Sequence, residues 1–137
     1  MDLLTAVRAF EAWAIRQDAR EEGWADAFPC WPDVHAAIRD LARQNEPVDT
    51  ETLAAVSKVL LWDEEGEITK EILLESQVLA RQVVLNETHQ EPEEVRYQII
   101  DLAVRLGERA AVETYLTDYS LRIRGRAERY INLGQDV

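Results

Sequence analysis

The sequence has few of the residues on which disulfide-bonded and metal-bound folds depend. It holds one cysteine, two histidines, five glycines and four prolines among 137 residues. A single thiol excludes an internal disulfide and a multi-cysteine zinc site, and it is typical of the reducing cytoplasm, where we expect the protein to reside. No stretch approaches the roughly eighteen consecutive apolar residues of a membrane-spanning helix, so we expect no membrane association.

Positive charge is also scarce. The chain has 27 acidic and 15 basic residues, a net charge of −12. The imbalance is greatest over residues 51–94, which carry a net charge of −8, whereas residues 95–137 carry +1. A surface of this sign repels phosphate backbones and attracts basic proteins. We therefore expect no direct nucleic-acid binding and a protein partner that is basic, although acidity also serves solubility alone.

The apolar residues recur at helical spacing, and the alternation typical of strands is nearly absent. The predicted helices cover residues 2–19, 33–44, 50–62, 67–85, 92–106, 108–117 and 120–133. The helix over 67–85 is apolar on most of its circumference, including Ile68, so we expect it to be central. The pattern predicts an all-α fold of six to seven helices in one compact domain over residues 1–137.

Two segments near the C-terminus align at an offset of 28, with Val95-Arg96 matching Ile123-Arg124. Residues 93–134 thereby resemble the HEAT repeat, a family of antiparallel helix pairs stacked into an α-α superhelix. In that family an aspartate between helices and an arginine six positions later stabilise adjoining units, and Asp118 and Arg124 have this spacing. The position six before Arg96 is Gln90, which departs from the pattern.

The resemblance implies an architecture and a class of function. It implies a HEAT-like pair over residues 93–134 that follows irregular N-terminal helices over residues 1–92. Folds of this kind are chiefly platforms that bind other proteins, so the resemblance implies no reaction.

Candidates for chemistry are few. His35 and His89 are far apart and lack the spacing of metal ligands. Cys30 lies just before a predicted helix and five residues before His35, but a structural thiol is the commoner case. Glu71 and Glu75 lie one helical turn apart, which suits either acid–base work in a cleft or a solvated stripe. We expect no catalytic residue, no metal and no cofactor.

The aromatic residues and the acids of the middle region offer a binding surface instead. Of the four tryptophans, the two beside predicted turns are the better interface candidates, because exposed tryptophans are favoured at binding hot spots. The predicted partner-binding residues are Trp24, Trp62, Asp63, Glu64, Glu65, Glu67, Glu71, Glu75, Glu91 and Glu94.

These features together favour a non-catalytic protein-binding module. Its most specific form is an acidic inhibitor, such as an immunity protein or antitoxin that neutralises a basic toxin enzyme. Three alternatives stay open: a nucleic-acid mimic that inhibits a DNA-binding defence protein, a scaffold or adaptor subunit, and a small enzyme that uses paired carboxylates. The partner's identity and the oligomeric state do not follow from the sequence.

Overall fold

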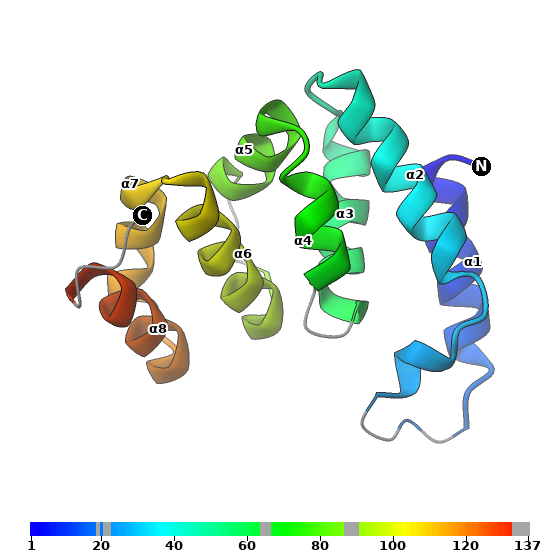
Figure 1. Cartoon of the computed structure of the whole chain (residues 1–137). Coiled ribbons are helices and arrows are strands. Elements are labelled where there is room, and N and C mark those ends of the chain that lie inside the picture. The colour runs from blue at the N-terminus through cyan, green and yellow to red at the C-terminus, as the bar shows by residue number, and fades with distance from the viewer. Residues whose placement is uncertain (19, 21–22, 64–66, 87–90, 133–137) are drawn as a thin grey trace. The chain divides into compact units, whose positions relative to one another are not determined.

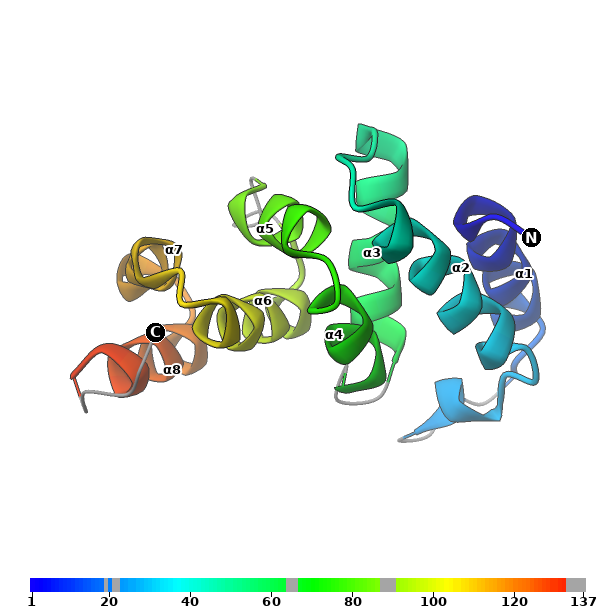
Figure 2. The same ribbon diagram turned by 45° about the horizontal axis from the view of Figure 1, so that its top comes forward.

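The computed structural model describes residues 1–18, 20, 23–63, 67–86 and 91–132. Within these ranges the chain forms eight α-helices and short 3₁₀ helices and no strand, which confirms the all-α prediction (Figures 1 and 2). None of the described helices combines the length and the apolar composition needed to cross a bilayer. The chain groups into two compact units, residues 1–79 and 80–137, and each is described by itself. One domain over residues 1–137, with a HEAT-like pair that follows residue 92, stays a prediction.

The first unit is a group of packed helices. Its elements are α1 (Leu3–Ile15), η1 (Trp24–Ala27), α2 (Trp31–Gln44), α3 (Thr50–Trp62), α4 (Glu67–Leu73) and the beginning of α5 (Gln77–Leu85). Helix α1 packs against α2 and α3, and α4 packs mainly against α2 and also against α3. This arrangement places the ends of α1, α2 and α3 around one aromatic core.

Side-chain caps explain where these helices begin. The Asp2 carboxylate accepts a hydrogen bond from the Thr5 backbone N–H at 2.8 Å, and Asp49 accepts one from Thr52 at the same distance. Each satisfies a backbone donor that the first helical turn leaves open. Helix α2 begins earlier than predicted, at Trp31, so Asp33 lies inside its first turn. Helix α1 ends at Ile15, four residues before its predicted end.

The predicted continuous helix over residues 67–85 is wrong, because the chain turns between α4 and α5. The Ser76 hydroxyl accepts a hydrogen bond from the Leu79 backbone N–H at 3.2 Å and so caps α5. The same hydroxyl donates to Oδ1 of Asn45 at 2.7 Å. Asn45 ends α2 in the left-handed conformation, with φ of 50°. Glu75 therefore lies in a turn rather than on one helix with Glu71.

The core of the first unit is aromatic. Phe10, which is 1% exposed, contacts five rings with centroids 4.2 to 5.8 Å away. We call this group the Phe10 cluster; its members are Phe10, Trp13, Trp24, Phe28, Trp31 and Trp62. Ring pairs at such separations are favourable beyond the area they bury. The cluster joins three helices and the segment between α1 and α2.

The second unit is built on three helices around an aliphatic core. Its elements are the rest of α5, α6 (Glu93–Leu106), α7 (Arg109–Glu113), η4 (Thr114–Thr117) and α8 (Leu121–Asn132). Helices α6, α7 and α8 pack on one another. Gly107 ends α6 in the left-handed region. The predicted helix over 108–117 is a short α-helix that continues as a 3₁₀ turn.

Candidate protein-binding surface

Both tryptophans predicted for the interface belong to the Phe10 cluster. Trp62 stacks on Phe10 at 4.2 Å between centroids, with 19° between the ring planes. Trp24 stacks on Trp13 at 5.8 Å, and the Arg20 guanidinium lies 4.6 Å from the Trp24 ring centroid. Both rings are half-buried. Both rings are part of the core, so only their exposed edges are accessible to a partner.

Asp63 has a structural environment that the sequence did not indicate. Its Oδ2 accepts hydrogen bonds from the backbone N–H and the hydroxyl of Thr69 and lies 3.4 Å from Nε2 of His35. The Asp63 and His35 side chains are only 11% and 12% exposed. Asp63 therefore links the end of α3 to α2 and α4 and is a poor candidate for a freely exposed partner-binding charge.

The electrostatics of Asp63 agree with this role. Burial alone would raise the pKa of the carboxyl, but hydrogen bonds from His35 and Thr69, together with the His35 charge, outweigh burial. The pKa of Asp63 consequently lies below its ordinary value. The carboxylate is held ionised by its neighbours within the unit.

The acids of α4 and the turn after it form the most exposed part of the predicted surface in this unit. We call Glu67, Ile68, Glu71 and Glu75 the α4 patch. Glu71 and Glu75 are exposed, and within the described residues no cation pairs with either. Glu67 lies 3.2 Å from the buried Nζ of Lys70. The predicted Glu64 and Glu65 lie outside the described residues.

The exposure of Ile68 differs from the burial that the sequence predicted. It was expected on the apolar circumference of a central helix, yet it is 48% exposed. The helix is shorter than predicted, so only part of its surface is covered, with Ile72 and Leu73 buried. The result is an exposed apolar side chain on the same helix as the exposed Glu71, three positions before it, a combination that suits protein recognition.

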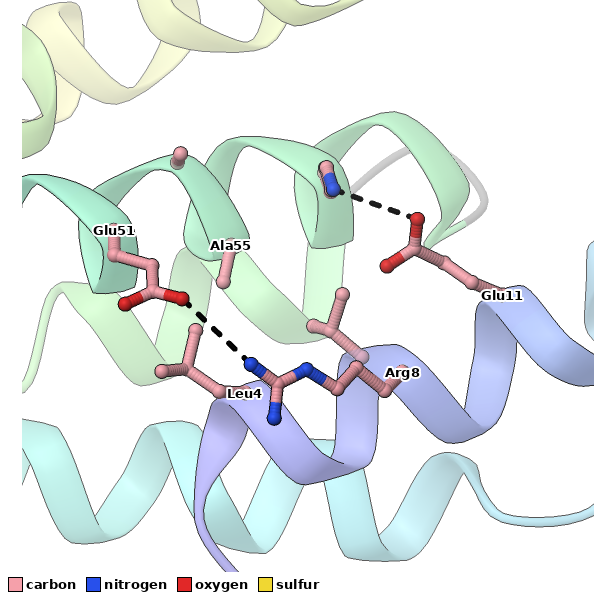
Figure 3. A pocket seen from close by; sticks show the side chains of 8 residues that line it. Leu4, Arg8, Glu11, Glu51 and Ala55 are labelled. Carbon is pink, nitrogen blue, oxygen red and sulfur yellow. Dashed lines mark hydrogen bonds and ion pairs between the residues drawn. The ribbon is translucent and has the colours of Figure 1, made fainter.

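A small hollow lies between α1 and α3, with a volume of about 140 Å³ (Figure 3). Its rim carries two ion pairs, Arg8 with Glu51 at 3.7 Å and Lys58 with Glu11 at 3.5 Å. The apolar lining comes from Leu4, Val7, Ala54 and Ala55. Small-molecule sites usually measure roughly 300–1,000 Å³. This hollow is smaller, its charges are paired, and the acids predicted for the interface do not line it.

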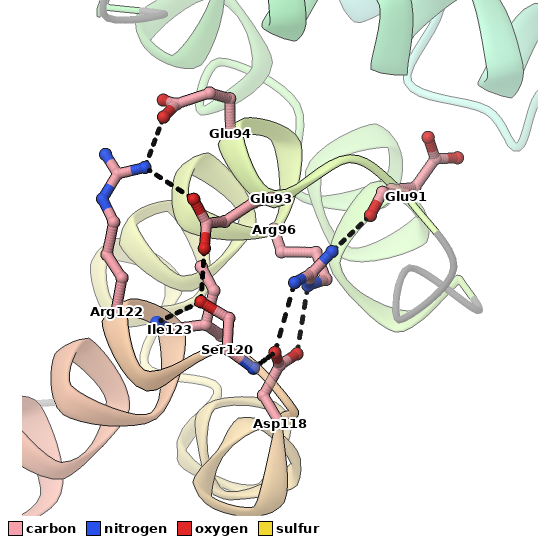
Figure 4. A network of polar contacts seen from close by, with 8 residues as sticks. All are labelled: Glu91, Glu93, Glu94, Arg96, Asp118, Ser120, Arg122 and Ile123. Atoms are coloured by element: carbon pink, nitrogen blue, oxygen red, sulfur yellow. Dashed lines mark hydrogen bonds and ion pairs between the residues drawn. The ribbon is translucent and has the colours of Figure 1, made fainter.

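The predicted acids of the second unit are partly neutralised. Glu94 and Glu93 both bind the Arg122 guanidinium, the latter at 3.3 Å (Figure 4). Glu91 is half-buried, and its backbone carbonyl accepts a hydrogen bond from Arg96 at 2.6 Å. Arg122 compensates one negative charge of the Glu93–Glu94 pair. The α4 patch is thus the stronger electrostatic feature.

A buried ion pair links α6 to the segment between η4 and α8. Arg96 binds Asp118 through Nε at 3.0 Å and through Nη2 at 3.2 Å, and each side chain is 1% exposed. The arginine that binds Asp118 thus lies 22 residues earlier in the chain, and the role that the resemblance implies for Asp118 and Arg124 stays a prediction. The sequence did not single out Arg96 as the partner of Asp118, although Arg96 matches Arg124 in the alignment at an offset of 28. Arg124 is half-buried on α8.

The remaining candidates for chemistry are Cys30 and the two histidines. In the part of the chain that the structure describes, no group of three or more His, Cys, Asp or Glu residues could hold a metal ion. Cys30 is half-buried at the start of α2. His89 lies outside the described residues.

No family model, no curated protein and no solved structure matches this chain. The HEAT-like repeat stays a prediction that rests on the residues quoted for it.

Proposed function

We propose that the chain is a non-catalytic protein-binding module whose first unit binds a basic protein. The observation that carries this proposal is the division of charge between the units. Residues 1–79 hold 17 acidic and 7 basic residues, a net charge of −10. Residues 80–137 hold 10 acidic and 8 basic residues, a net charge of −2. A field concentrated in one unit attracts and orients a basic partner more than an evenly spread charge would.

The α4 patch is the proposed contact point in this unit. Glu71 and Glu75 are exposed and have no cationic partner among the described residues, so their charge acts on the solvent side. Such charges mainly raise the association rate and make it depend on salt. Ile68 supplies apolar area beside them, which slows dissociation once water is excluded.

The specific form that we propose is an immunity protein or antitoxin that neutralises a basic toxin enzyme. The acidity of the chain and its helical surface support this form. An inhibitor of this kind needs a complementary surface and a fast encounter, and it needs no reaction of its own.

The test begins with the purified chain as bait in a lysate of its own cells, with bound proteins identified by mass spectrometry. The decisive comparison is between two variants with equal charge change, Glu71→Lys/Glu75→Lys and the control Asp26→Lys/Glu46→Lys. All four positions are exposed. We expect a basic protein to be retained by the wild type and by the control and lost by the first variant.

The captured protein is then purified and its binding kinetics are measured. We expect the association rate to fall at least tenfold between low and high salt, and again in the Glu71→Lys/Glu75→Lys variant. A captured protein that is acidic, or that both variants retain equally, would refute the α4 patch as the contact point. Stoichiometric loss of the captured protein's enzymatic activity tests the inhibitor form.

A further inference from the structure

Helix α4 is too short to be stable by itself. It has seven residues, and isolated helices shorter than roughly twelve residues are marginal in water. Its position therefore depends on contacts with α2 and α3, the helices against which it packs. Ile72 and Leu73 supply buried apolar contacts. Thr69 supplies a polar one, because it is buried and hydrogen-bonded to Asp63 at the end of α3.

Three helices meet at one carboxylate oxygen. Oδ2 of Asp63 accepts hydrogen bonds from the backbone N–H of Thr69 at 3.1 Å and from the Thr69 hydroxyl. Nε2 of His35, on α2, lies 3.4 Å from the same oxygen. We call Asp63, His35 and Thr69 the Asp63 junction. One of its members is therefore a histidine, the side chain whose charge ordinarily changes between about pH 5 and 8.

The carboxylate of the junction keeps its charge over that range. Burial raises the pKa of Asp63, but the hydrogen bonds from His35 and Thr69 and the His35 charge outweigh burial, so the pKa lies below its ordinary value. A protonated His35 compensates the charge of this carboxylate, which is only 11% exposed. When His35 is neutral, the donors that the structure describes at Asp63 are all neutral. A buried charge without a counterion is costly, so the junction favours the protonated histidine.

The Trp31 ring favours the same charge state of His35. The two rings stack with 5.5 Å between their centroids and 22° between their planes. A cation at this distance from an indole face is attracted by the quadrupole of the ring. The imidazole thus lies beside an ionised carboxylate and an aromatic face, and both interactions are stronger when it carries a proton.

The other charged groups of the packed helices are paired or exposed. Those of α1 and α3 pair with each other across the two helices. On α4, Lys70 pairs with Glu67, and Glu71 is exposed. The charged side chains of α2 besides His35 are all exposed. By helix, the groups not yet named are Arg8 and Glu11 on α1, Glu51 and Lys58 on α3, and Asp33, Arg39, Asp40 and Arg43 on α2. His35 is therefore the titrating group of the junction near neutral pH.

We propose that the Asp63 junction makes the attachment of α4 depend on pH: a proton on His35 strengthens the attachment, and loss of that proton loosens it. The attachment weakens as the pH rises through the titration of His35, and it is also lost as the pH falls through the native pKa of Asp63. Above the titration of His35, Thr69 and the buried Ile72 and Leu73 still hold α4. The helix then opens locally more often while the unit stays folded.

The test is amide hydrogen exchange of the full chain, measured for each residue by NMR at about pH 5 and about pH 8, below and above the titration range of histidine. Protection factors correct for the intrinsic effect of pH on exchange. The Thr69 amide and the other α4 amides should be protected about fivefold less at the higher pH, because a charge-assisted hydrogen bond is roughly twice as strong as a neutral one. Equal protection at both pH values overturns the proposal.

Matched variants assign the effect to the junction. His35→Gln keeps a neutral donor and should show the lower protection at both pH values. His89→Gln removes the other histidine of the chain and should respond as the wild type does. Asp63→Asn removes the carboxylate instead of the imidazole and should also abolish the response, so the test does not depend on one variant being folded. A pH response that persists in His35→Gln or in Asp63→Asn overturns the proposal.

A comparison within the wild type separates local opening from unfolding of the whole unit. Val56 is fully buried in the middle of α3. Its amide should be protected more than those of α4 at both pH values, because α4 opens without α3. Equal protection of the two helices would mean that α4 detaches only when the unit unfolds, and it would overturn the local attachment.

The junction also regulates the proposed binding surface, because α4 carries Ile68 and Glu71 of the α4 patch. This consequence rests on the proposed function. The dissociation rate of the captured basic protein should depend more strongly on pH for the wild type than for His35→Gln, and equal dependence would overturn the regulation. The exchange measurements use no partner, so their outcome is separate from that of the proposed function.

Discussion

The interactions inside the first unit differ from those inside the second. The first unit contains all four tryptophans, and its core is the Phe10 cluster. The second contains all four tyrosines, and arginines lie against several of them. Arg122 and Arg126 lie 4.3 and 4.2 Å from the Tyr97 ring centroid, and Arg126 lies 5.0 Å from that of Tyr130. Ring packing thus forms the core of one unit, whereas ion pairs and cation–π contacts add to an aliphatic core in the other.

Because of this difference, we expect the stability of the two units to respond to different perturbations. Ring packing depends on shape and buried area, and salt affects it little. Ion pairs and cation–π contacts depend on charge and on its screening. The distribution of aromatic residues lets each response be read separately, because tryptophan fluorescence reports only the first unit and tyrosine signals report only the second.

The largest expected effect is in the Phe10 cluster. Phe10→Ala removes the ring that five others contact and should lower the free energy of unfolding of the first unit by about 4 kcal/mol. Urea denaturation followed by tryptophan fluorescence measures it. The exposed Ile15→Ala on the same helix is the control and should change little. A loss below about 1 kcal/mol for Phe10→Ala would mean that the cluster is not the core.

Removing one member of the buried ion pair should have the next largest effect. Asp118→Ala leaves the Arg96 guanidinium buried without its carboxylate and should destabilise the second unit by about 3 kcal/mol. The double variant Arg96→Met/Asp118→Leu removes both charges and should cost much less than the single variant. Denaturation followed by tyrosine signals measures both. Equal losses in the single and double variants would contradict the assignment of the cost to an unpaired charge.

Asp63→Asn should destabilise the first unit by about 1–2 kcal/mol at neutral pH, because it removes the charge that His35 and Thr69 stabilise. The native pKa of Asp63 lies below its ordinary value of about 3.9, so the stabilisation is present above that value and is lost as the pH falls through the native pKa. The difference between wild type and variant should therefore shrink towards pH 3. Denaturation curves at several pH values measure it, and a constant difference would contradict the role of the charge.

Salt should have the smallest effect on stability, and the sign of this effect should differ between the two units. Raising sodium chloride from about 0.05 to 0.5 M screens the self-repulsion of the first unit and should stabilise it by a few tenths of a kcal/mol. The same salt weakens exposed pairs of the second unit, such as Arg109 with Glu113, by a similar amount. Parallel tryptophan and tyrosine measurements on one sample test this. A shift of the same sign in both signals would mean that the charge difference does not govern stability.

The sequence predicted most helices because their apolar spacing and end signals are local. Asp2, Asp49 and Gly107, at the ends of three of these helices, are such local signals. The break between α4 and α5 was missed because apolar residues continue across it and conceal the cap at Ser76. That cap depends on Asn45, 31 residues away, and periodicity carries no information about such contacts.

The candidate surface was predictable only in its charge. The acidic character of the middle region follows from counting residues, but the environment of each acid does not. Asp63 and Glu71 are both acids beside apolar residues in the sequence, yet one is enclosed by His35 and Thr69 and the other is exposed. The exposure of Ile68 depends on where α4 ends and which helices cover it, and that is a tertiary property.

Asn45 has a practical consequence for anyone who wants to make this protein more robust. A left-handed residue at the end of a helix is a routine place to introduce glycine, which adopts that conformation without strain. Here the replacement would also delete the amide oxygen that holds Ser76, and with it the start of α5 would lose its anchor. One side chain ends α2 and fixes the beginning of α5, so the two helix ends should fray together, and engineering one of them alters the other.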